Sequence, residues 1–231
     1  MKFLKPRLIT FLLSIAAGAA IALGGILFLL ASAFIPNDFV IDKKLIGALL
    51  FPVGLMLVCY LRLNLYTGKI GMAFRNKKLD KKGLPTWEWL INILLGNAVG
   101  AFLIGAIVYL ICLPLDGTAF KAAVNAAGAS RDMAFEFQPI FDMSYKSILC
   151  GMLVYIAIFF FNRLDNQFGK IVGIIVPIAF FVYAGFQHCV ANMFYMAASG
   201  CWTWNYLVGL LITIVGNSLG ALLLDLFVKY K

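Results

Sequence analysis

Six apolar stretches dominate this sequence, and each has about the 20 residues that a helix needs to cross a bilayer. They cover residues 8–34, 45–74, 87–113, 143–161, 171–198 and 204–228. Of the 231 residues, 63% are hydrophobic and only 13% are charged, whereas a soluble domain carries far more charge. The first stretch is too long for the core of a signal peptide, so we interpret it as a retained span. We predict an all-α membrane protein with six transmembrane helices.

Two of these spans are interrupted by polar residues. The second contains RLNLYTGK at 62–69, and the fifth contains GFQHCVANMF at 185–194, which holds the only histidine, His188. Polar residues that break a helix at membrane depth are tolerated where they are buried in protein or line a pathway. We therefore predict broken second and fifth helices, with His188 at the second break. The alternative role for His188 is a hydrogen-bonded histidine that packs helices together.

The two halves of the chain repeat each other. LLGNAVGAFL at 94–103 matches IVGNSLGALL at 214–223, and the same offset places Tyr66, Thr67 and Gly68 on residues 186–188. Since the first and fourth spans enter from opposite sides, the repeats are inverted, an arrangement typical of transporters. Helix packing through small residues explains the glycines but not the matched breaks. We expect one transmembrane channel domain over 1–231, with repeat one at 1–113, a connector at 114–141 and repeat two at 142–231.

The charged residues predict the orientation. One side of the six spans carries Lys2, Lys5, Arg7, Arg75, Lys77, Lys78, Lys81, Lys82, Arg163, Lys170, Lys229 and Lys231. On the other side, Lys43, Lys44, Lys121 and Arg131 are offset by Asp38, Asp42, Asp116, Asp132, Glu136 and Asp142. The positive-inside rule then predicts a multi-pass protein of the plasma (inner) membrane with cytoplasmic N- and C-termini. The net charge of +9 fits this topology, and we expect no nucleic-acid partner.

Several motifs resemble those of the formate/nitrite transporter family, over essentially the whole chain. They are GFQHCVANMF at 185–194, LYTG at 65–68, GNAVGA at 96–101, SILCGMLV at 147–154 and IALGGILF at 21–28. The resemblance implies an aquaporin-like protomer in a homo-pentamer, with a pore in each subunit. It also implies passage of small monovalent anions such as formate, nitrite, lactate or hydrosulfide.

The same resemblance implies the residues of the pore. It places Phe51 and Phe181 at an outer constriction, and Leu55, Leu65 and Val154 at an inner one. Thr67 lies in the second-span break beside His188, with Asn192 nearby. Hydrophobic rings of this kind reject hydrated ions, because an ion must shed water to pass. In so dry a chamber, we expect His188 to be neutral.

One departure from the family pattern bears on the substrate. Members that pass anions carry a lysine about eleven residues before the motif matched by SILCG, whereas counting back from Lys146 reaches Phe135 with Glu136 beside it. A carboxylate there opposes an anion and favours a cation, so we predict passage of ammonium or methylammonium. The alternative is a formate, nitrite or hydrosulfide channel, in which Lys69 or Arg131 supplies the positive field and Glu136 is a solvated loop residue.

Residues for catalysis are scarce. The sequence has no second histidine, no paired carboxylates within a span and no phosphate-binding glycine loop, so we predict no enzyme, no metal and no cofactor. The five cysteines form no CxxC pair, which is typical of small core residues. A purely structural membrane protein is a further alternative, but it has no need of two matched helix breaks.

Overall fold

A computed structural model describes residues 6–73, 86–115 and 117–229 of the chain. It contains six helical stretches that are long and apolar enough to cross a membrane, so the predicted all-α class with six spans is confirmed. Several residues of the predicted charge pattern lie outside the described part, namely Lys2, Lys5, Arg75, Lys77, Lys78, Lys81, Lys82, Asp116 and Lys231, together with the side chain of Lys229.

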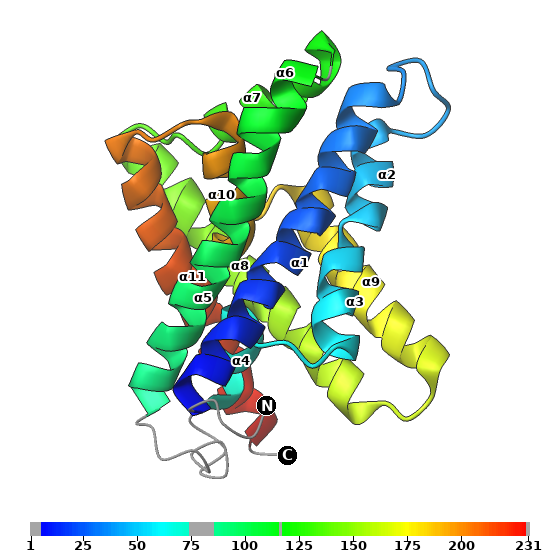
Figure 1. The fold of residues 1–231 in the computed structure, drawn as a ribbon. Helices are drawn as coiled ribbons and strands as arrows, with labels where there is room; N and C mark the ends of the chain where they lie inside the picture. The colour runs from blue at the N-terminus through cyan, green and yellow to red at the C-terminus, as the bar shows by residue number, and fades with distance from the viewer. Residues whose placement is uncertain (1–5, 74–85, 116, 230–231) are drawn as a thin grey trace.

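Four of the spans are long helices that pack in two pairs. α1 (Pro6–Phe34) packs on α5 (Thr86–Ile107), and α8 (Phe137–Arg163) packs on α11 (Trp204–Lys229). α5 continues through a π-helical turn, η2 (Val108–Cys112), into α6 (Leu113–Leu115). In Figure 1, α1 begins and α11 ends at the same, lower end of the molecule. We call this the termini end.

The second and fifth spans are both discontinuous, as the sequence predicts. The second consists of α2 (Lys43–Leu50), α3 (Pro52–Tyr60) and α4 (Tyr66–Ala73), with a non-helical stretch at 61–65. The fifth consists of α9 (Gln167–Ala184) and α10 (Cys189–Ser199). α9 ends at Gly185, whose left-handed backbone (φ 75°) suits a residue without a Cβ atom. The division between α2 and α3 was not predicted, and it falls at Pro52, which has no N–H to continue the hydrogen bonding.

Each break is held by one buried asparagine from the span that follows it. The Asn97 side chain accepts from the N–H of Tyr66 at 2.7 Å and donates to the carbonyls of Ser14 and Asn64, both at 2.8 Å. Asn217 does the same in the second half for the N–H of Cys189 (2.9 Å) and the carbonyls of Ser147 and Gln187 (2.8 Å each). Backbone groups freed by a break have no water to bond at membrane depth, so these amides replace it.

These bonds also correct the predicted register of the two breaks. Asn97 lies 31 residues after its N–H partner Tyr66, whereas Asn217 lies 28 residues after Cys189. The second half is therefore three residues shorter between the break and the asparagine. Tyr66 corresponds to Cys189, and the counterpart of His188 is Leu65 rather than Gly68. Alignment of the two GN motifs could not reveal this difference. It applied one constant offset between the halves, although the segment between the break and the asparagine differs in length.

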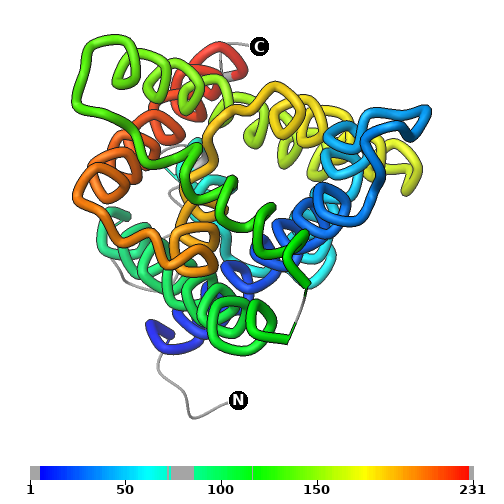
Figure 2. The backbone as a smooth tube through the Cα atoms, turned by 90° about the horizontal axis from the view of Figure 1, so that it is seen from above, coloured from blue at the N-terminus to red at the C-terminus, as the bar shows by residue number. Residues whose placement is uncertain are grey.

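The connector is more helical than predicted. It forms α7 (Thr118–Ala129), and α8 begins at Phe137, six residues before the predicted start of the fourth span. A search of the sequence for long apolar runs does not detect a short helix such as α7. Pro139 falls in the first turn of α8, where a missing N–H costs no intrahelical bond. Viewed from above in Figure 2, α7 crosses the upper end of the bundle.

Candidate functional site

Two cavities lie on opposite sides of the helix breaks. The upper vestibule has a volume of about 750 Å³ and is walled by residues of α1, α2, α7, α9 and α10. The lower vestibule, at the termini end, has a volume of about 590 Å³ and is walled by α3, α4, α8, α9 and the stretch at 61–65. The two cavities have no lining residue in common. Buried side chains therefore separate two water-accessible chambers.

The apolar side chains predicted for two constrictions are buried. The rings of Phe51 and Phe181 line the upper vestibule and meet edge to face, with centroids 5.8 Å apart. Leu55, Leu65 and Val154 are only 1–2% exposed, and Leu65 reaches the wall of the lower vestibule. The residues that the family resemblance names for two constrictions are thus all buried, and those of the outer constriction line the upper vestibule.

His188 lines the upper vestibule beside Phe181. It is the residue that caps the N-terminus of α10, and its Nδ1 accepts a hydrogen bond from the N–H of Ala191 at 3.2 Å. Its Nε2 lies 2.9 Å from the Thr67 hydroxyl of α4, and its ring stacks on Phe181 with centroids 6.0 Å apart. Because Nδ1 accepts, the imidazole proton belongs on Nε2, which donates to Thr67. Both side chains are at most 3% exposed.

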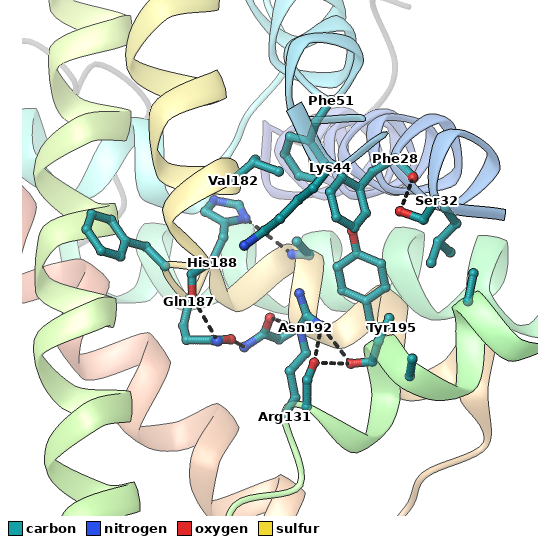
Figure 3. A pocket seen from close by; sticks show the side chains of 18 of the residues that line it. Phe28, Ser32, Lys44, Phe51, Arg131, Val182, Gln187, His188, Asn192 and Tyr195 are labelled. Atoms are coloured by element: carbon teal, nitrogen blue, oxygen red, sulfur yellow. Dashed lines mark hydrogen bonds between the residues drawn. The ribbon is translucent and has the colours of Figure 1, made fainter. Parts of the chain in front are cut away.

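Arg131 reaches this region from the loop after α7. Its Nε donates to the Asn192 side-chain oxygen at 2.8 Å, and its Nη1 donates to the Ala127 carbonyl at 2.6 Å. The guanidinium lies over the Tyr195 ring, 4.0 Å from the centroid. Asn192 in turn donates to the side-chain oxygen of Gln187 at 3.0 Å, in the break itself. Figure 3 shows this chain of polar contacts along the floor of the upper vestibule, close to His188.

Lysines complete the wall of the upper vestibule. Lys43, Lys44 and Lys146 all line it, and Figure 3 shows the Lys44 side chain pointing into the cavity. Lys146 is partly neutralised by Asp142, 3.6 Å away on the same face of α8. Neither Asp142 nor Glu136, the carboxylate expected from the sequence near the pathway, lines the cavity.

Glu136 lies away from both vestibules. It is exposed at the start of α8, where it occupies the N-cap position without a side-chain capping bond. Glu136 was reached in the sequence by counting residues back from Lys146, and such a count does not show which way a loop side chain points. Arg131, which the sequence offered as the alternative source of positive field, lines the cavity instead.

The lower vestibule carries its own cations. Lys69 of α4 lines it together with Arg62 and Lys170. Lys69 was a sequence candidate, whereas Arg62 and Lys170 were not singled out, and neither were Lys44, Lys146 and Gln187 of the upper vestibule. For Arg62 and Gln187 the sequence did hold a signal, since both lie in the polar interruptions of the apolar spans. The lysines lie near span ends, where their sequence context is that of ordinary topology signals.

The chain matches proteins of one family throughout. The family model for the formate/nitrite transporter matches residues 2–231. An uncharacterized transporter, YrhG, of Bacillus subtilis is 33% identical over 229 residues, covering 95% of this chain and 84% of that protein. A probable formate transporter of Methanothermobacter thermautotrophicus is also 33% identical over 229 residues, covering 90% and 82%. The formate channel FocB of Escherichia coli is 27% identical over 197 residues, covering 84% and 67%.

Solved structures agree with this assignment at the level of the fold. A pentameric formate channel with formate bound superposes with a TM-score of 0.79 at 22% identity, covering 98% of this chain and 96% of that one. An FNT family ion channel also gives a TM-score of 0.79, at 24% identity, covering 97% and 90%. With six spans, two asparagine-held breaks and a family model matched from end to end, the chain belongs to the formate/nitrite transporter family of membrane proteins.

Proposed function

We propose that this protein is a channel or transporter for small monovalent anions, with formate as the best-supported substrate. One observation carries the proposal. Every lysine, arginine, aspartate or glutamate that lines either vestibule is a cation: Lys43, Lys44, Arg131 and Lys146 above, and Arg62, Lys69 and Lys170 below. Pathways lined by one sign of charge raise the local concentration of ions of the opposite sign.

The helix breaks add to this preference. The half-helices α4 and α10 begin at Tyr66 and Cys189, and the contact between Thr67 and His188 shows that their N-termini meet. A helix N-terminus carries a partial positive charge, and discontinuous helices of transporters direct such ends at anionic groups. Two positive ends at the middle of the pathway stabilise an anion and oppose ammonium.

The ammonium hypothesis therefore loses its basis. It rested on Glu136 replacing a cation at the pathway, and Glu136 lines neither vestibule, while relatives of this chain are named formate channels. In the account that we favour, Arg131 supplies the field and Glu136 is a solvated residue. Phe51 with Phe181, and Leu55 with Leu65 and Val154, form the two constrictions, and the pair of Thr67 and His188 lies between them.

The comparison with a pentameric channel supports a proposal for the assembly, and the charge pattern supports one for the orientation. We propose a homo-pentamer in the plasma membrane, because the superposing formate channel is described as pentameric. Each subunit is one channel domain made of two inverted repeats joined by α7. The termini end faces the cytoplasm, as the positive-inside rule predicts.

Flux in reconstituted vesicles tests this proposal. Purified protein in liposomes should carry labelled formate far faster than empty liposomes do, and the Arg131→Gln variant should carry it more slowly. Glu136→Gln, which removes a charge at the same end of the molecule, serves as the control and should behave like the wild type. Formate flux no faster than through empty liposomes would refute the proposal.

A further inference from the structure

Three cationic side chains line the lower vestibule. Arg62, Lys69 and Lys170 come from three different segments and line one cavity of about 590 Å³. None of them forms an ion pair with a carboxylate in the part of the chain that the structure describes. The amides of Asn162 and Gln167 line the same cavity and add hydrogen-bonding groups.

In the upper vestibule, a carboxylate pairs with one of the cations. There Asp142 pairs with Lys146, and Arg131 is held by Asn192, Ala127 and the Tyr195 ring. In the lower vestibule, the Lys170 ammonium lies over the ring of Phe161, 5.4 Å from its centroid, and no carboxylate of the described residues pairs with it. A carboxylate therefore offsets one cation of the upper vestibule, whereas none is offset in this way among the three described cations of the lower one.

Arg62 has an unusual backbone for an arginine. Its φ of 55° lies in the left-handed region, and among the described residues it is the one non-glycine residue with positive φ. Glycine and asparagine favour this conformation, whereas long side chains do so rarely. Backbone strain of this kind concentrates at functional sites, so it draws attention to the side chain that this position presents to the cavity.

We propose that the lower vestibule is a binding site for a doubly charged oxyanion, for which sulfate or hydrogen phosphate is the simplest example. One unit charge at about 8 Å through water changes the local concentration of a monovalent anion by about two- to threefold, and that of a divalent anion by the square, about sixfold. Three uncompensated cations thus favour divalent over monovalent anions strongly. The NH₂ group of Gln167, and the N–H of Asn162 that does not bond the Ile158 carbonyl, are suited to donate to the oxygens of such an anion.

A divalent anion bound there blocks the pathway rather than crossing it. The next layer toward the centre is apolar and buried, with Leu65 at the cavity wall. The cost of removing an ion from water rises steeply with its charge, so a layer that a formate ion crosses stops a sulfate ion. The blocking part of this inference rests on the proposed anion flux, whereas the binding part does not.

Sulfate is the probe of choice, because its charge does not change near neutral pH. Binding of labelled sulfate to the purified protein is compared between wild type, Arg62→Asn, Lys170→Gln and Arg163→Gln. Arg62→Asn removes one charge while placing a residue that tolerates the left-handed backbone. Arg163 is an exposed arginine at the same end of the molecule and lies outside the cavity lining, so Arg163→Gln is the matched control.

We expect the Arg62 and Lys170 variants to bind sulfate about sixfold more weakly than the wild type, and the Arg163 variant to bind it equally well. Unaltered sulfate affinity in both cavity variants, or no saturable sulfate binding to the wild type, overturns the proposal.

The second measurement is formate flux in vesicles that hold the protein in one orientation, verified by cleavage of a C-terminal tag, with gluconate keeping the ionic strength constant. Sulfate on the termini side should inhibit flux of the wild type, and about sixfold more sulfate should be needed for the same inhibition of Arg62→Asn. Equal sensitivity of the wild type and Arg62→Asn to sulfate on the termini side, or transport of sulfate itself, contradicts the block. Sulfate binding without any formate flux in the wild type would instead refute the proposed function and leave the site intact.

Discussion

Replacement of Arg131 by glutamine should lower formate flux about tenfold at low ionic strength. The Arg131 guanidinium lines the upper vestibule and is fixed there by Asn192, Ala127 and the Tyr195 ring. An anion about 6 Å from this charge, at an effective dielectric constant of roughly 40 between protein surface and water, gains about 1.4 kcal/mol, a factor of about ten. The glutamine keeps a polar side chain but removes the charge.

The assay is the initial rate of labelled formate uptake into liposomes that contain equal amounts of each variant. Arg131→Lys keeps the charge but loses the forked geometry, so its uptake should stay within about threefold of the wild type. The deficit of Arg131→Gln should shrink as salt is raised, because exposed charges are screened over about 10 Å at 0.1 M. Uptake by Arg131→Gln equal to that of the wild type, or a larger change in Glu136→Gln than in Arg131→Gln, would refute the role of Arg131.

Three further variants test the structure around the breaks. Asn217→Ala removes three hydrogen bonds and leaves the buried N–H of Cys189 without its partner, at about 1–3 kcal/mol for that group, so it should unfold at a clearly lower temperature in a thermal assay, and wild-type stability would contradict the bonding. Thr67→Val keeps the side-chain shape but removes the partner of His188, so it should be destabilised by about 1–3 kcal/mol, measured in the same assay; no change would mean that the imidazole needs no partner there. Phe51→Ala removes one of the two rings that meet at 5.8 Å, so lactate uptake should rise relative to formate uptake, and an unchanged ratio would exclude this constriction as the size filter.

Much of the fold is predictable from the sequence for simple physical reasons. A bilayer fixes the length of each apolar span, and the polar interruptions at 62–69 and 185–194 have no stable place in lipid, so both breaks are predictable. The matched asparagines Asn97 and Asn217 were visible as repeated GN motifs. Their function as partners for the freed backbone groups was not, because hydrogen bonds between distant segments leave no local pattern.

Which charged residues line the vestibules could not be predicted from the sequence. Glu136 and Arg131 lie five positions apart in a polar loop, and which of them faces the cavity depends on how the loop turns before α8. A count of residues along the chain does not show which way each side chain points. In the structure, Arg131 bonds Asn192 and Glu136 is exposed. The sequence also gave no means to distinguish Lys44 and Lys146 from lysines that merely flank a span, although both line the upper vestibule.

Selectivity between formate and methylammonium, measured as the two initial uptake rates into the same vesicle preparation, tests the central claim most directly. The cations of both vestibules and the two half-helix N-termini predict rapid uptake of formate, and methylammonium uptake no faster than into empty liposomes. Uptake of methylammonium above that background, with formate excluded, would contradict the account and restore the cation hypothesis.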